Sequence, residues 1–123
     1  MINILFWLYF VNSVLLINHE IDSAYWKEWD LFRMKGGVAG FLVLHFPMLF
    51  IVLYGLVLVS QQSFVGLFFS LLLSASGIFA FFIHTYFIKK GRKEFDTPVS
   101  MFILISTLVV SVVQFAFTVT ALI

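Results

Sequence analysis

Residues 64–88 read FVGLFFSLLLSASGIFAFFIHTYFI, an uninterrupted run without Lys, Arg, Asp or Glu. An α-helix rises ~1.5 Å per residue, so this run would be ~38 Å long as a helix. The hydrocarbon core of a bilayer is only ~30 Å thick. The stretch therefore predicts a helix that crosses a membrane.

Three further runs lack the same four residue types, and they cover residues 1–18, 38–60 and 101–123. Each has the length that a membrane-crossing helix needs, the first one barely. The first run has neither the basic start nor the small-residue cleavage site of a signal peptide, so we expect it to be retained. The sequence thus predicts an all-α fold, a single domain over residues 1–123 in which four transmembrane helices form a bundle.

The composition of the whole chain agrees with a membrane location. Of its 123 residues, 63% are hydrophobic and 11% are charged, whereas about a quarter of the residues of soluble proteins are charged. So few polar side chains could not cover a surface that faces water. The absence of Cys excludes disulfides and thiolate metal sites, and no exposed basic stripe is present to bind nucleic acid.

Every charged side chain falls in two of the three connections between the runs, residues 20–37 and 89–98. The third connection, residues 60–63, is an uncharged Ser-Gln-Gln-Ser turn that makes the second and third runs antiparallel neighbours. Because Lys and Arg gather on the cytoplasmic side of membrane proteins, we expect the charged connections there. Both termini would then lie on the non-cytoplasmic side. We expect a multi-pass protein of the inner (plasma) membrane, surrounded by membrane lipids.

The connections also contain local structure. Residues 19–34 interleave apolar and charged side chains, which predicts that the first helix continues past the edge of the lipid. Gly36-Gly37 should end this helix, because glycine tolerates the left-handed conformations of a sharp reversal. Thr97-Pro98 predicts the cap and first turn of the fourth helix.

The three His residues all fall in the half of the bundle that carries the charges. His19 ends the first run, and at ~1.5 Å per residue His45 lies ~10 Å into the second and His84 ~6 Å from the end of the third. Three different helices thus bring an imidazole to a similar depth. Because ionisable residues at membrane depth are energetically expensive, this convergence indicates a functional site.

The types of these residues indicate a metal site. Imidazole and carboxylate groups bind zinc, iron or manganese, and a chain without Cys would hold such an ion through nitrogen and oxygen alone. The predicted ligands are the side chains of His19, Asp22, His45 and His84. Glu20 and Glu28 are predicted to be general bases or hydrogen-bond partners of the ligands. The plainer interpretation is that shallow His and acidic side chains only bond neighbouring helices or reach water.

One stretch also suggests a family. Residues 18–29 read NHEIDSAYWKEW, and Gly36-Gly37 and His45-Phe46-Pro47 follow. With this pattern the chain resembles a family of small bacterial four-span membrane proteins of unknown function. The resemblance covers most of the chain and implies the four-span layout, but it implies no activity. Other membrane families in which acidic residues follow a His at a helix end are more weakly similar, and their double-Glu pattern is missing here.

Three functions agree with these features. The first is a metal-dependent enzyme that acts on a lipid or other apolar substrate in the cytoplasmic leaflet, by hydrolysis with zinc or by oxidation with iron. The second is electron transfer by a b-type haem held between His45 and His84. The third is a non-catalytic accessory protein, in which polar residues of the fourth helix and the aromatic segment 25–29 pack against a partner membrane subunit or a second copy. These interpretations leave open whether the protein is an enzyme.

Overall fold

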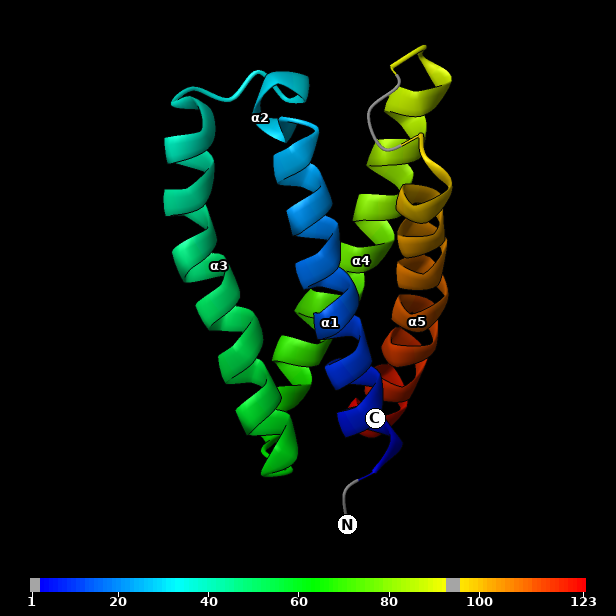
Figure 1. Ribbon diagram of the computed structural model, residues 1–123. Helices are drawn as coiled ribbons and strands as arrows, with labels where there is room; N and C mark the ends of the chain where they lie inside the picture. Colours follow the sequence, from blue (N-terminus) through cyan, green and yellow to red (C-terminus); the bar gives the residue numbers. More distant parts are fainter. Residues whose placement is uncertain (1–2, 93–95) are drawn as a thin grey trace.

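The computed structural model describes residues 3–92 and 96–123, which are all-helical and contain no strand (Figure 1). The helices long and apolar enough to cross a membrane are α1 (Ile4–Tyr25), α3 (Gly37–Ser60), α4 (Phe64–Lys89) and α5 (Pro98–Leu122). A short helix, α2 (Glu28–Leu31), lies between α1 and α3. The predicted all-α bundle of four transmembrane helices is confirmed, and the chain is a multi-pass membrane protein.

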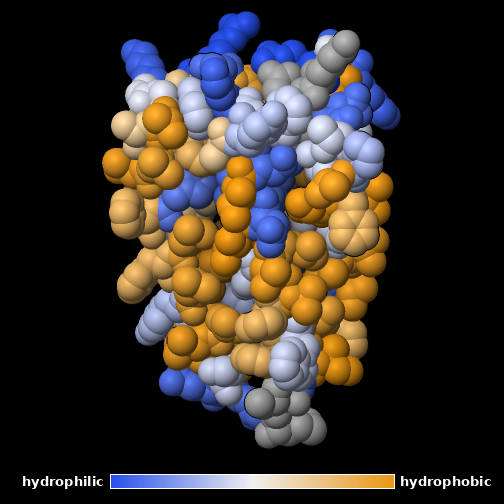
Figure 2. All heavy atoms as spheres, in the orientation of Figure 1, coloured by the Kyte–Doolittle hydropathy of each residue, from blue (hydrophilic) through white to orange (hydrophobic). Residues whose placement is uncertain are grey.

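The four long helices do not pack equally closely. The most extensive contacts join α5 to α4 and to α1, whereas α3 makes fewer contacts with α1 and α4. In Figure 1 both termini lie at the lower end of the bundle, and α2 lies at the upper end, which we call the charged end. From their turn at the lower end, α3 and α4 diverge toward the charged end. Figure 2 shows hydrophobic atoms over the middle of the visible face and most of the hydrophilic atoms at the charged end.

The helix starts follow the local sequence signals. Asn3, Ser63 and Thr97 cap α1, α4 and α5, and each side-chain oxygen accepts a backbone N–H of the first turn. Pro98 lies in the first turn of α5, where its missing N–H leaves no helical bond unmade. Gly36, with a φ of 97°, precedes α3 in the left-handed conformation that the Gly-Gly pair predicts.

The first helix differs from its prediction. It extends beyond residue 18 but ends at Tyr25, and Lys27, with a φ of 55°, turns the chain before α2 begins. The prediction of one continuous helix up to Gly36 was therefore wrong. After the turn, Leu31 is buried in one apolar cluster with Leu104 of α5. The turn also carries Glu28 back over the end of the bundle.

Apolar contacts hold α1 against α3 and α4 in the half of the bundle that contains the termini. This core is formed by Leu5, Tyr9, Leu16, Val52, Val59 and Leu73. The hydroxyl of Tyr9 donates a hydrogen bond of 2.7 Å to the carbonyl oxygen of Val52 in α3. Gly55 makes room for this ring, because a Cβ atom there would overlap the Tyr9 hydroxyl and lie 2.9 Å from Phe69 Cβ.

A polar network joins α1, α4 and α5 near the middle of the bundle. Gln114 accepts a hydrogen bond of 2.8 Å from Asn12 and donates one of 2.9 Å to the hydroxyl of Ser70. Asn12 also donates to Ser111, and Ser70 bonds Thr118. Ser111, Gln114 and Thr118 of α5 thus face the bundle interior, where they bond α1 and α4. Bonds of this kind hold helices together where burial of apolar surface gives no net gain.

Candidate metal site

Two of the three imidazoles meet at the charged end of the bundle. His19 in α1 and His84 in α4 are both buried, and their Nε2 atoms lie 3.0 Å apart. The rings approach edge to face, with centroids 4.7 Å apart. Each lies on the inward face of its helix, as Ser23 does in α1 and Ser74 and Gly77 do in α4. The 3.6-residue period of the helices therefore directs both rings to the same point.

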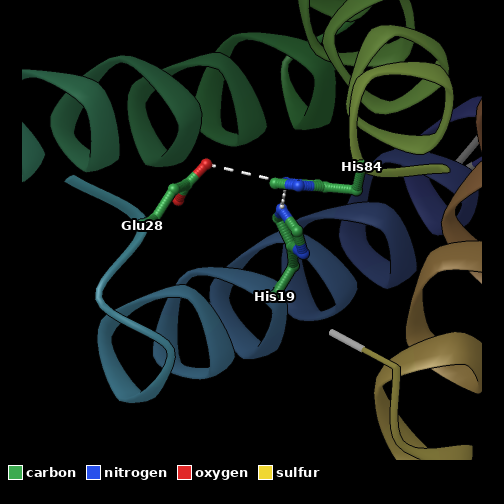
Figure 3. A group of neighbouring side chains, drawn as sticks. All are labelled: His19, Glu28 and His84. Atoms are coloured by element: carbon green, nitrogen blue, oxygen red, sulfur yellow. Dashed lines mark hydrogen bonds and ion pairs between the residues drawn. The ribbon is translucent and has the colours of Figure 1, made fainter. Parts of the chain in front are cut away.

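Glu28 of α2 completes a cluster with these two rings. Its Oε1 atom lies 3.6 Å from Nε2 of His84, and one ligand atom from each of the three residues lies within 4.8 Å of the other two. Figure 3 shows the three side chains converging from α1, α2 and α4, with Glu28 placed by the backbone that follows the turn at Lys27. We call His19, Glu28 and His84 the His-Glu cluster.

The spacing of the cluster resembles that of ligands around one ion. Two imidazole nitrogens bound to one tetrahedral ion at ~2.0–2.1 Å lie ~3.3 Å apart, close to the observed 3.0 Å between His19 and His84. Without an ion, one Nε2 must donate a proton to the other, because both cannot carry one at this distance. Two His and one carboxylate is the ligand set of several catalytic zinc sites and of non-haem iron sites with open coordination positions. The cluster has the composition for such an ion, and its two imidazoles have the spacing.

The protonation of Glu28 depends on its surroundings. Burial, with the nearby charge of Glu20, raises the pKa of its carboxyl group from 4.5 to about 7 against the opposing effects of the Ser23 hydrogen bond and of His45. The side chain is 12% exposed. Near neutral pH the carboxyl group is therefore divided between a protonated form and a form that can bind a cation.

His45 lies in a second pair beside the cluster. Its Nδ1 atom lies 2.7 Å from the carbonyl oxygen of Phe41, and its Nε2 atom lies 2.8 Å from Oε2 of Glu20. A carbonyl oxygen only accepts hydrogen bonds, so Nδ1 carries a proton and donates it to Phe41, while Nε2 faces the carboxyl group of Glu20. The ring of Phe41 lies against the imidazole, with centroids 4.0 Å apart. We call His45 and Glu20 the His-Glu pair.

An apolar cavity of about 340 Å³ lies below the His-Glu cluster, between α1, α3 and α4. His19, His84, Glu20 and Glu28 line one part of it. Its apolar wall includes Leu16, Met48, Ile51, Val52, Leu72, Leu73 and Phe79. The cluster, and Glu20 of the pair, therefore border a space into which an apolar molecule fits.

The structure distributes the predicted site residues over three interactions. His19 and His84 lie together. Glu28, predicted as a base or partner, lies close enough to both that the three side chains could hold one ion. His45 bonds Glu20 instead, and Asp22 accepts a hydrogen bond of 3.0 Å from the indole of Trp26. The sequence signals the depth of each His, but the approach of Glu28 depends on the left-handed turn at Lys27, for which the sequence carries no glycine.

Comparison with known proteins identifies a family but no activity. The model of a family described as a family of unknown function (DUF6713) matches residues 5–121. No curated protein and no solved structure matches the chain.

Proposed function

Because the chain belongs to this family of unknown function, which supplies no activity, we propose a function from the site alone. The protein is a metal-dependent membrane enzyme that acts on a lipid or other apolar substrate. Its His-Glu cluster holds a zinc, iron or manganese ion, and its substrate occupies the adjoining cavity. The observation that carries this proposal is the position of the cluster, three ligand atoms within 4.8 Å of one another at an apolar cavity of about 340 Å³.

The energetic cost of the cluster supports a functional role. His19 and His84 are 3% and 2% exposed, within helices that cross the membrane. Two buried imidazoles and a carboxyl group contribute less to stability than apolar side chains of similar volume would. A functional role explains why the chain has them there. A bound ion would satisfy all three groups at once.

The ion and the His-Glu pair would have different roles in the reaction. A divalent ion with two imidazoles and one carboxylate would supply a Lewis acid with open positions for water or substrate oxygen. Glu20 lines the same cavity and is held by His45, whose own orientation is set by the Phe41 carbonyl. The His-Glu pair therefore serves as the proton acceptor of the reaction, in agreement with the role as a base predicted for Glu20.

The test is the metal content of the purified full-length protein and of three matched variants. We expect about one zinc, iron or manganese ion per chain after reconstitution, and a sharp loss in His19→Ala and in His84→Ala, because each removes a ligand. His45→Ala should keep the ion, because His45 bonds Glu20 outside the cluster. Equal loss in all three variants would contradict the assignment of the ligands.

Optical spectra distinguish the remaining interpretations. Cobalt in place of the native ion should give the visible bands of nitrogen and oxygen ligation, without the absorption of a thiolate. A haem spectrum that disappears in His45→Ala and His84→Ala would favour electron transfer. A protein with no stoichiometric metal and no chromophore would overturn the enzyme proposal in favour of the accessory protein.

A further inference from the structure

The cavity beside the cluster has a chemistry that selects its ligand. We infer that it receives a single-chain lipid with an uncharged, oxygen-bearing head group, such as a long-chain alcohol or aldehyde, which enters sideways from the bilayer between α3 and α4. The inference rests on the proposed function in one respect, that the head group meets the metal ion.

The walls of the cavity indicate the entry route. Leu16, Val52 and Leu73 are buried, whereas Leu72 is 56% exposed and Phe79 65% exposed. The cavity therefore continues from the bundle interior onto the surface of α4 that faces the lipid. α3 and α4 also diverge toward the charged end (Figure 1). A hydrophobic chain can thus pass from the bilayer into the cavity without crossing water.

The charges around the cavity indicate the head group. Two carboxyl groups, Glu20 and Glu28, line it, and among the described lining residues there is no Lys or Arg. A phosphate head group would face these carboxylates without a cationic side chain to pair with, so anionic lipids are disfavoured. The charge of one divalent ion is just enough to balance the two carboxylates, so none is left to attract a phosphate. An uncharged hydroxyl or carbonyl oxygen can fill an open coordination position of the ion without adding charge.

The volume indicates a single chain. Ligand pockets span ~300–1,000 Å³, and about 340 Å³ lies near the lower limit. One acyl or isoprenoid chain fits this volume, whereas the two chains of a phospholipid would have to remain partly in the bilayer. The cavity is therefore matched to one chain whose polar end lies at the His-Glu cluster.

Photolabelling of the full-length protein in detergent tests this inference. The two probes are hexadecanol and hexadecyl phosphate, each with a diazirine in the middle of the chain. We expect hexadecanol to label peptides from residues 48–52 and 72–83, with competition by unlabelled hexadecanol. The phosphate should label them about tenfold less, because its charge meets two carboxyl groups.

A pair of Phe substitutions controls for chain insertion at any apolar surface. Ser76 is exposed and lines the cavity, so Ser76→Phe should fill it and suppress labelling. Val109 is 57% exposed on α5 and does not line the cavity, so Val109→Phe should leave labelling unchanged. Equal labelling of both variants, or equal labelling by the two probes, would overturn the inference.

The metal content of the same samples separates this inference from the proposed function. Specific labelling by hexadecanol in a protein that binds no metal would support a lipid site and overturn the enzyme. Stoichiometric metal without labelling of α3 and α4 would support the metal site and overturn the lipid inference.

Discussion

At the scale of single residues, Glu28 is the group whose protonation links stability to the proposed metal binding. Its pKa in the folded protein is about 7, against 4.5 for an ordinary Glu. A raised pKa means that the folded state holds the proton more tightly, so the stabilisation is present below pH 4.5 and is lost as pH rises toward and through 7. At ~1.4 kcal/mol per pKa unit, the loss reaches about 3 kcal/mol.

Glu28→Gln should therefore have opposite effects with and without metal. Gln stays neutral, so the metal-free variant should be more stable than wild type at pH 8 by up to about 3 kcal/mol and nearly equal at pH 4.5. With metal present, the variant should bind the ion less tightly because it lacks the carboxylate ligand. Thermal unfolding in detergent, with and without chelator, measures both effects. A metal-free variant that is less stable at pH 8 would contradict the burial of a titrating carboxyl group.

The positions of two His residues could be predicted from the sequence, whereas the partner of the third could not. The depths of His19 and His84 follow from counting residues along apolar runs, and their common inward face follows from the helical period. The orientation of His45 depends on the tilt and rotation of α3, which bring Nε2 to Glu20. Periodicity in a helix that is apolar on every side carries little information about rotation, so this partner could not be predicted.

At the scale of helices, the network around Gln114 holds α5 to α1 and α4. Gln114→Leu would remove its bonds to Asn12 and Ser70 and leave these buried groups without them. Hydrogen bonds between membrane helices contribute ~0.6 kcal/mol on average and up to ~1.7. We expect a loss of about 1–2 kcal/mol in unfolding free energy, measured by denaturation in detergent micelles.

A double-mutant cycle tests whether this loss comes from the bond between helices. Asn12→Leu and Gln114→Leu should be coupled by about 0.5–1.5 kcal/mol, because the second substitution removes a bond already broken by the first. Thr120→Ala is the matched control, since Thr120 is exposed on α5 and bonds only the carbonyl of Ala116 in its own helix. A loss in the control equal to that of Gln114→Leu would assign the effect to α5 itself.

The elements themselves were largely predictable, and the exception has a physical cause. Long apolar runs identify membrane helices because the backbone must be hydrogen-bonded internally within lipid. Residues 26–34 lie outside that constraint, where the chain can exchange helical bonds for burial of Leu31. Helical periodicity alone does not reveal such an exchange, because it depends on Leu104, which is far away in the sequence.

At the scale of the whole molecule, the charges and the candidate site lie at the same end of the bundle. α2 and the start of α3 are at that end, and both termini are at the other (Figure 1). All Lys and Arg residues belong to the connections of the charged end. If this end faces the cytoplasm, the His-Glu cluster opens toward the cytoplasmic leaflet, and any ion must be loaded from the cytoplasm.

We expect the charged end of the molecule to face the cytoplasm. Reporters fused after Ile123 and inserted at Gly91 should give opposite results, the first silent and the second active for an enzyme that works only in the cytoplasm. Gly91 is exposed in the connection between α4 and α5, with open space around it, so an insertion there leaves the helices intact. Ile123 lies at the other end of the bundle and is 99% exposed.

Charge substitution shows whether Lys and Arg cause the orientation. The test variant has Gln in place of Lys89, Lys90 and Arg92, and Lys in place of Gln61 and Gln62 in the opposite turn. Part of its population should insert the other way, because the orientation of a membrane protein follows the Lys and Arg residues of its short loops. Gln at the three positions without the added Lys residues is the control, and it should shift the ratio less. An active reporter after Ile123 in the wild-type chain would reverse the orientation and place the His-Glu cluster in the opposite leaflet.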